Sequence, residues 1–294
     1  WTDSFIPMSV VPKPKKIVRV MVGRLELLTR QREELAEAAI QGLASDKEAK
    51  RAESFAYLQG QGRYVEPIVR RVLNSTKDET TKLLCRRLLL TDFVNELRAS
   101  AHAASDGKML MIDPIQQRAQ LARVLREIGQ NQEAKNEGLA VLRSLKEAEA
   151  AAVGDRNPSQ IQYSLEIKAT AIEATGVDRS AADTYRQCIA TFVSTLDEQV
   201  HPATLSWCKD WWVGQAYGRS LARAGELDRT IGELKAAIAG KESVPPKELR
   251  LTRLLLAYLY EVQGKTEAAD GFWAMLKHES EETAVNNAES TALR

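Results

Sequence analysis

The chain has 294 residues, and its 41 Lys and Arg against 40 Asp and Glu leave a formal net charge of +1. This balance creates no overall field that would select nucleic acid, an anionic membrane or an acidic substrate, so any recognition by charge has to be local. Only 6% of the residues are aromatic, Gly and Pro are sparse, and the strong helix formers Ala, Leu, Glu, Lys and Arg are abundant, which is typical of an all-α protein.

Residues 1–24 are predicted to form an extended basic arm. Three prolines and several β-branched residues break any helical period there. The segment 13–24 contains five cations and no acid: Lys13, Lys15, Lys16, Arg19 and Arg24. A solvated tether is the favoured interpretation, and a strap that docks on an acidic or phosphate surface is the alternative.

Residues 25–112 are predicted to form an N-terminal helical region. The stretch around Gly62 resembles a degenerate copy of the repeat described below, although Pro67 stands where the repeat has a small residue. The helices that follow could equally be HEAT-like. A basic stretch runs from Arg70 to Arg87, opposed only by Asp78 and Glu79. The favoured interpretation of this stretch is the solvent-exposed face of an amphipathic helix, and the alternative is a patch that binds nucleic acid or phospholipid.

Several helix starts carry capping signals. A Ser or Thr followed three residues later by Glu has the spacing of a capping box, and Asp or Asn before Pro places a capping residue ahead of the first helical position. The signals are Ser45 with Glu48, Thr76 with Glu79, Asp113 with Pro114, and Asn157 with Pro158.

Residues 113–278 contain an internal repeat that is marked by four glycines, Gly129, Gly176, Gly225 and Gly264. Seven residues before each glycine stands a small residue, and four before it a larger apolar one. Five residues after it comes a small residue in each copy, and the ninth position is bulky in three of four. This pattern predicts pairs of antiparallel helices, in which each glycine ends the first helix in a left-handed conformation and small residues allow close packing.

Segments such as LARVLREIGQNQEA, AYGRSLARAGELDRTIGELKAAI and LAYLYEVQGKTEAADGFWAML resemble the tetratricopeptide repeat (TPR) family. The resemblance implies an α-solenoid of stacked helix hairpins, preceded here by the extended arm. The glycine spacings of 47, 49 and 39 residues exceed the family's unit of about 34, and the family's Trp early in the first helix is missing. Residues 279–294 are predicted to be a flexible polar tail, because they lack a periodic apolar stripe.

If the repeats stack in this way, the positions 13, 10, 6, 3 and 2 residues before each glycine line the concave face of the stack. Arginine recognises carboxylates with two parallel hydrogen bonds, and Tyr and Trp supply large contact areas, so the mixture suits a peptide or an acidic protein segment. An ordinary polar helix face is the equally weighted alternative. The predicted partner-binding residues are Arg123, Arg126, Tyr163, Trp212, Arg219, Arg223 and Tyr258, and Gln116 and Glu166 fall on the same positions.

Three tryptophans, Trp207, Trp211 and Trp212, cluster before one helix. Trp207 and Trp211 are four residues apart and share a face, so we expect them to pack into the preceding repeat. Trp212 points elsewhere, which makes an exposed ring there a candidate for a binding hot spot, although a core position is favoured.

The sequence contains no recognisable arrangement for catalysis. Its three histidines are isolated, and it has no zinc-binding spacing, phosphate-binding loop or nucleophile elbow, so we predict no catalytic site, metal or cofactor. Cys85, Cys188 and Cys208 lie in apolar helical contexts and are predicted to be buried free thiols, with a bridge between Cys188 and Cys208 left open. No apolar run approaches the roughly 20 residues that cross a bilayer.

These features favour a scaffold or adaptor that holds a peptide, a disordered segment or a neighbouring subunit. The first alternative is a regulatory or targeting domain of a larger enzyme. The second is a helical repeat protein that binds nucleic acid, which the near-neutral charge balance and the few aromatics disfavour.

Overall fold

The computed structural model describes residues 30–105, 114–151, 157–196, 202–239 and 244–292. Within these ranges the protein is all-helical, as the composition predicts, and no described residue forms a strand. The predicted arm at residues 1–24 and the capping residue Asp113 lie outside the described residues. The chain divides into two compact units, one comprising residues 1–96 and 127–129 and the other residues 97–126 and 130–294.

The first unit contains α2 (Arg30–Leu43), α3 (Glu48–Gln61), the short 3-10 helix η1 (Gly62–Val65), α4 (Glu66–Ser75) and the first part of α5 (Glu79–Ser105). Its core joins Leu43, Leu58, Val69 and Cys85, each at most 1% exposed. The turn at Gly62 has φ 59° and ψ −139°, whereas Gly176 in the second unit has φ 89° and ψ 6°. The degenerate copy therefore turns differently from the repeat that it resembles.

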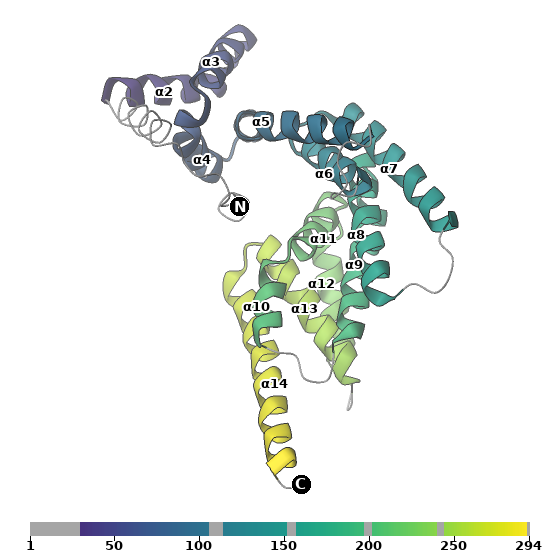
Figure 1. Ribbon diagram of the computed structural model, residues 1–294. Coiled ribbons are helices and arrows are strands. Elements are labelled where there is room, and N and C mark those ends of the chain that lie inside the picture. The colour runs from purple at the N-terminus through teal and green to yellow at the C-terminus, as the bar shows by residue number, and fades with distance from the viewer. Residues whose placement is uncertain (1–29, 106–113, 152–156, 197–201, 240–243, 293–294) are drawn as a thin grey trace, which may run out of the picture. The chain divides into compact units, whose positions relative to one another are not determined.

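The second unit is built from helices that pack against their neighbours (Figure 1). They are α6 (Pro114–Glu127), α7 (Asn131–Ala151), α8 (Pro158–Thr175), α9 (Asp178–Thr195), α10 (Pro202–Asp210), α11 (Trp212–Arg223), α12 (Leu227–Ile238), α13 (Pro246–Val262) and α14 (Thr266–Ala292). One cluster of buried residues joins α6, α7 and α8, and a larger one extends from α8 to α14. This is a repeat-like arrangement of helices. The segment predicted to be a flexible tail is helical as far as Ala292, because α14 continues through it.

The four repeat glycines occupy equivalent places. Each lies in the short turn after α6, α8, α11 or α13, and each has a positive φ of 72–89°. After three of them the next backbone N–H donates to the carbonyl five residues earlier: Gln130 to Leu125, Glu226 to Leu221 and Lys265 to Tyr260. These bonds satisfy carbonyls that the helix end leaves free. The predicted glycine turns are confirmed.

One small residue of the repeat, Gly218, serves a different contact from the one expected. A Cβ placed on Gly218 would lie 2.7 Å from Cγ2 of Val262, which belongs to α13 and not to the partner helix of the same hairpin. Gly138 of α7 stands at the ninth position after Gly129, where the other copies are bulky, and a Cβ there would lie 2.6 Å from the Ala171 carbonyl oxygen of α8. At these two sites, small side chains bring successive hairpins together.

The capping predictions had mixed outcomes. Asn157 caps α8 in a full capping box with Gln160, ahead of Pro158, as expected. At α5 the cap is Asp78, whose carboxylate accepts from the Thr81 N–H at 2.7 Å, two residues later than the predicted Thr76. The box predicted at Ser45 is not formed, since α3 begins at Glu48 and its N-cap residue, Lys47, makes no side-chain capping bond.

Candidate functional site

The predicted partner-binding residues lie on α6, α8, α11 and α13, the first helices of the four hairpins. The structure brings Arg123, Arg126, Trp212 and Arg223 together at one place, although they belong to the first and third hairpins. They meet around the second hairpin, at the end of α8 and the start of α9. Most of the interactions that these four residues make are with other side chains of this protein.

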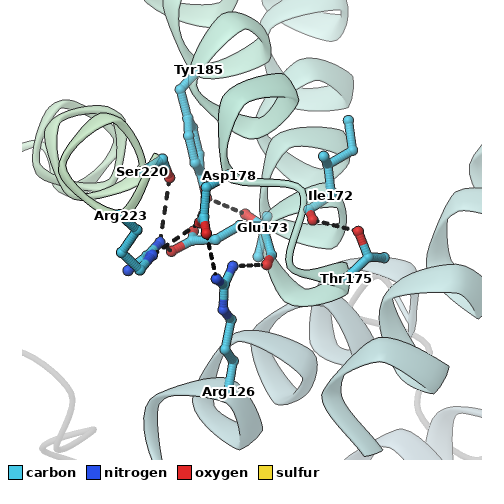
Figure 2. A network of polar contacts seen from close by, with 9 residues as sticks. Arg126, Ile172, Glu173, Thr175, Asp178, Tyr185, Ser220 and Arg223 are labelled. Atoms are coloured by element: carbon cyan, nitrogen blue, oxygen red, sulfur yellow. Dashed lines mark hydrogen bonds and ion pairs between the residues drawn. The ribbon is translucent and has the colours of Figure 1, made fainter. Parts of the chain in front are cut away.

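Arg126 and Arg223 share one carboxylate (Figure 2). Nη2 of Arg126 lies 2.7 Å from Oδ2 of Asp178, and Nε of Arg223 lies 2.9 Å from Oδ1 of the same residue. Asp178 occupies the first turn of α9, where a negative charge also interacts favourably with the helix dipole. The two predicted binding arginines are therefore tied to this protein's own Asp178, which links three successive hairpins.

Glu173 completes the network from the last turn of α8. It is 5% exposed, its backbone carbonyl accepts from Arg126, and its carboxylate accepts from Arg223 and from the Tyr185 hydroxyl, the latter at 2.7 Å. Figure 2 shows these contacts converging on the turn between α8 and α9. A buried carboxylate is tolerated because hydrogen-bond donors surround it.

The bond between Glu173 and Tyr185 has a counterpart in the last hairpin. Nε1 of Trp273 donates to Oε1 of Glu261 at 2.7 Å. In both hairpins the acceptor stands three residues before the repeat glycine and the aromatic donor nine residues after it. The sequence pattern assigned the acceptor position to the binding face, so this hydrogen-bonded pair was not predicted. The recurrence of Glu at the acceptor position is a signal that could have revealed the pair.

The network makes stability depend on pH through Asp178. Burial by itself raises the pKa of Asp178, but hydrogen bonds from Arg126 and Arg223 outweigh it and hold the pKa below its ordinary value of 3.8. A carboxyl whose pKa is lower in the folded state stabilises the fold above its unfolded pKa, and this stabilisation is lost as the pH falls through the folded pKa.

We therefore expect Asp178→Asn to lower the free energy of unfolding by about 1–2 kcal/mol at pH 7, the range for hydrogen bonds to charged groups that remain partly solvated. The deficit should shrink as the pH falls from about 5 to below 3.8, because protonation then removes the same charge from the parent protein. Urea unfolding of both proteins at pH 7, 5 and 3.5 measures this difference in the free energy of unfolding. A deficit of equal size at all three pH values would contradict this account.

Arg123 lies over Trp212, with its Cζ 4.4 Å from the ring centroid. The ring also stands edge-on to Tyr185, at 6.0 Å between centroids. Burial raises the pKa of Glu166 above its ordinary value of 4.5, and Arg123 and Trp212 offset part of that rise. Trp212 is thus half-buried beneath an arginine and packs against the core, so the favoured core position describes its place better than an exposed ring does.

The other tryptophans behave as expected. Trp211 is buried, and its ring stacks on Trp207 at 5.1 Å between centroids. Both rings also contact Phe192 of α9, at 5.2 and 5.3 Å. The prediction that they pack into the preceding repeat is confirmed, although Trp207 remains 47% exposed.

Tyr258 is not a surface residue, so its prediction as a partner-binding residue is wrong. It is fully buried, its hydroxyl donates to the Cys208 carbonyl at 2.5 Å, and its ring stands edge-on to Trp273. The ring also fills the space beside Gly214, where an added Cβ would lie 2.3 Å from it. The ring is therefore enclosed by α11 and α14, and its hydroxyl is bonded to α10.

Two predicted residues remain accessible. Tyr163 is 38% exposed, and its hydroxyl donates to Oε1 of Gln116 at 3.1 Å. Arg219 is half-buried and forms no hydrogen bond or ion pair with the rest of the described chain. Arg123 also lacks a carboxylate within salt-bridge distance among the described residues, and its Nε is buried without a hydrogen-bond partner.

A shallow hollow of about 300 Å³ lies beside the network. It is lined by Arg126, Asn131, Gln132, Lys135, Ala174, Thr175 and Gly176. Its polar side chains are two cations, two amides and the hydroxyl of Thr175. Elsewhere within the described ranges, no group of three or more His, Cys, Asp or Glu side chains could hold a metal ion.

The remaining candidates from the sequence have local roles. In the basic stretch Arg70 pairs with Glu66, Lys82 pairs with Glu79, and Arg87 donates to the Ile128 carbonyl at 2.7 Å. The three cysteines are buried and free, so no bridge joins Cys188 to Cys208. None of the described helices has the length and apolar composition needed to cross a membrane.

Comparison of the chain with protein-family models, with curated proteins and with solved structures finds no match.

Proposed function

We propose that this protein is a TPR-like helical-repeat scaffold that holds an acidic segment of a protein partner on the inner face of its stacked hairpins. The observation that carries the proposal is the recurrence of one hairpin: four glycines with positive φ in equivalent turns, each flanked by packed helices. Stacked hairpins of this kind present the first helices of successive repeats side by side, which creates an extended surface for a partner.

The charges on that face support an acidic partner. Arg126 and Arg223 are neutralised by Asp178 and Glu173. Arg219 on α11 has no such carboxylate among the described residues, and Arg123, at the same repeat position on α6, has none within salt-bridge distance there and interacts with Glu166 only at longer range. A guanidinium without an anionic partner can bind a carboxylate through two parallel hydrogen bonds. The accessible ring of Tyr163 adds apolar contact area on the neighbouring α8.

The test measures binding of a fluorescent Glu- and Asp-rich peptide by anisotropy. We expect Arg219→Glu to weaken binding about tenfold or more, which corresponds to roughly 1.4 kcal/mol, because it replaces attraction by repulsion. Arg223 is a poor choice for this test, since its substitution would also break the network around Asp178.

The matched control is Arg229→Glu on α12. Arg229 is an exposed arginine whose side chain is 74% accessible and is paired only with Glu233 in the next turn. We expect this change to alter the affinity less than twofold, and neither variant should shift the thermal midpoint by more than about 2 °C. Equal losses in the two variants, or no binding of the acidic peptide by the parent protein, would refute the proposal.

A further inference from the structure

The junction between the first and second hairpins differs from the two junctions that follow it. At the second junction, Arg179 of α9 pairs with Glu226 in the turn after α11. At the third, the Gln263 amide in the turn after α13 donates to Asp228 of α12. In both cases the residue three positions after one repeat glycine bonds to the turn that contains the next repeat glycine. These bonds tie successive turns together.

The corresponding residue at the first junction is Gln132 of α7, and it forms no bond with the described turn at 175–177. Its amide donates instead to Asn136 of the same helix, at 3.1 Å. In the facing turn, the Thr175 hydroxyl donates within its own helix, and Val177 is 52% exposed. The shallow hollow of about 300 Å³ lies at this junction, where both Gln132 and Thr175 line it.

Lys135 lines this hollow at a position that the next two hairpins fill with buried apolar residues. Six residues after its repeat glycine, the first hairpin has Lys135, the second Ala182 and the third Ile231. Ala182 and Ile231 are buried, whereas Lys135 is exposed and forms no hydrogen bond or ion pair with the rest of the described chain. The other cation of the hollow, Arg126, is already neutralised by Asp178. Lys135 therefore brings an uncompensated positive charge to the hollow.

The side chains of the hollow fit an anion with several acceptor oxygens. Among the described residues that line it there is no carboxylate. The donors come from two helices: Lys135 and Asn131 of α7, neither of which bonds to another described residue through its side chain, and Arg126 of α6. A phosphoryl group carries about −1.5 to −2 charges at pH 7 and presents three acceptor oxygens, whereas a carboxylate presents two. The volume of about 300 Å³ is at the lower end of the range for ligand sites and leaves room for such a group.

We propose that this hollow binds a phosphoryl group, with Lys135 as its principal cation. A phosphorylated side chain of a partner protein and free phosphate offer the same chemistry, and two probes separate these sources. The site goes beyond the proposed binding of an acidic segment and does not depend on it.

The first probe is a fluorescent peptide that carries one phosphoserine among Gly, Ala and Ser, with no Asp or Glu, and its binding is measured by anisotropy. The second is inorganic phosphate, measured by calorimetric titration. Lys135→Ala installs the residue type that the second hairpin has at the equivalent position, so the fold should be retained. The matched control is Lys235→Ala, which removes an exposed lysine from α12.

We expect Lys135→Ala to weaken phosphoryl binding about fivefold or more, because a charge-assisted hydrogen bond is lost, and Lys235→Ala to change it less than about twofold. A phosphopeptide that binds more tightly than inorganic phosphate would assign the site to a protein partner, and inorganic phosphate that binds at least as tightly would assign it to the free anion.

Three results would overturn the proposal: no binding of either probe, equal binding of the unphosphorylated peptide, or equal losses in the two lysine variants. Neither probe carries Asp or Glu, so a failure here is distinguishable from a failure of the acidic peptide to bind.

Discussion

Replacement of Gly214 by alanine should destabilise the second unit by about 2–3 kcal/mol, at the upper part of the range for an overpacked core. The new Cβ would lie 2.3–2.4 Å from three atoms of the Tyr258 ring. That ring cannot move aside easily, because it is fully buried, packs edge-on to Trp273 and is held by its bond to the Cys208 carbonyl. Thermal unfolding followed by circular dichroism should show a midpoint lower by about 5–10 °C.

Gly232→Ala is the matched control for this effect. Gly232 also lies inside a helix, α12, but no atom lies within 4 Å of the position of its Cβ. Alanine there should stabilise the protein by about 0.5–1 kcal/mol, since glycine costs that much in a helix interior. If both substitutions stabilised the protein, the close approach of α11 to Tyr258 would be wrong.

Removal of the Glu173 carboxylate should have an effect of similar size. We expect Glu173→Ala to lower the free energy of unfolding by about 2–4 kcal/mol, because deleting one member of a buried charged network leaves its partners without compensation. The Tyr185 hydroxyl would lose its 2.7 Å bond in a fully buried position, and Arg223 would keep only Asp178 as its anionic partner. Urea unfolding at pH 7 measures the change.

Glu233→Ala provides the comparison, because its carboxylate pairs with Arg229 on an exposed face, and it should cost less than about 1 kcal/mol. A double-mutant cycle between Glu173→Ala and Tyr185→Phe separates the hydrogen bond from other effects. Additive changes in this cycle, or a cost for Glu173→Ala no larger than that for Glu233→Ala, would show that the network does not stabilise the stack.

Together these contacts change how the predicted binding face is understood. Four predicted binding residues do gather there, but Arg126 and Arg223 hold neighbouring hairpins together through Asp178. In the proposed function, the groups left to bind the acidic partner segment are Arg219, Tyr163 and the outer side of Arg123. A binding experiment that mutated Arg223 would therefore mix a loss of structure with a loss of affinity.

Short-range signals predicted much of the helical framework. The glycine turns and the Asn157 cap depend on backbone conformations and hydrogen bonds within a few residues, which the local sequence encodes directly. The failures at Ser45 and Thr76 have the same short range: several polar side chains compete near each helix start, and Asp78 displaces Thr76 as the cap. Spacing alone does not rank such competitors.

The sequence by itself determined that the described part of this protein is all-helical, where its repeated hairpins turn, and that its cysteines lie in apolar surroundings. Only the tertiary structure decided which polar residues are exposed and so available to bind a partner. Asp178 pairs with Arg126 from 52 residues away and with Arg223 from 45, and the Cys208 carbonyl accepts a hydrogen bond from Tyr258 from 50. Periodicity assigns a side chain to a face of its own helix, but exposure depends on what the rest of the chain places against that face, and such long-range contacts leave no local trace in the sequence.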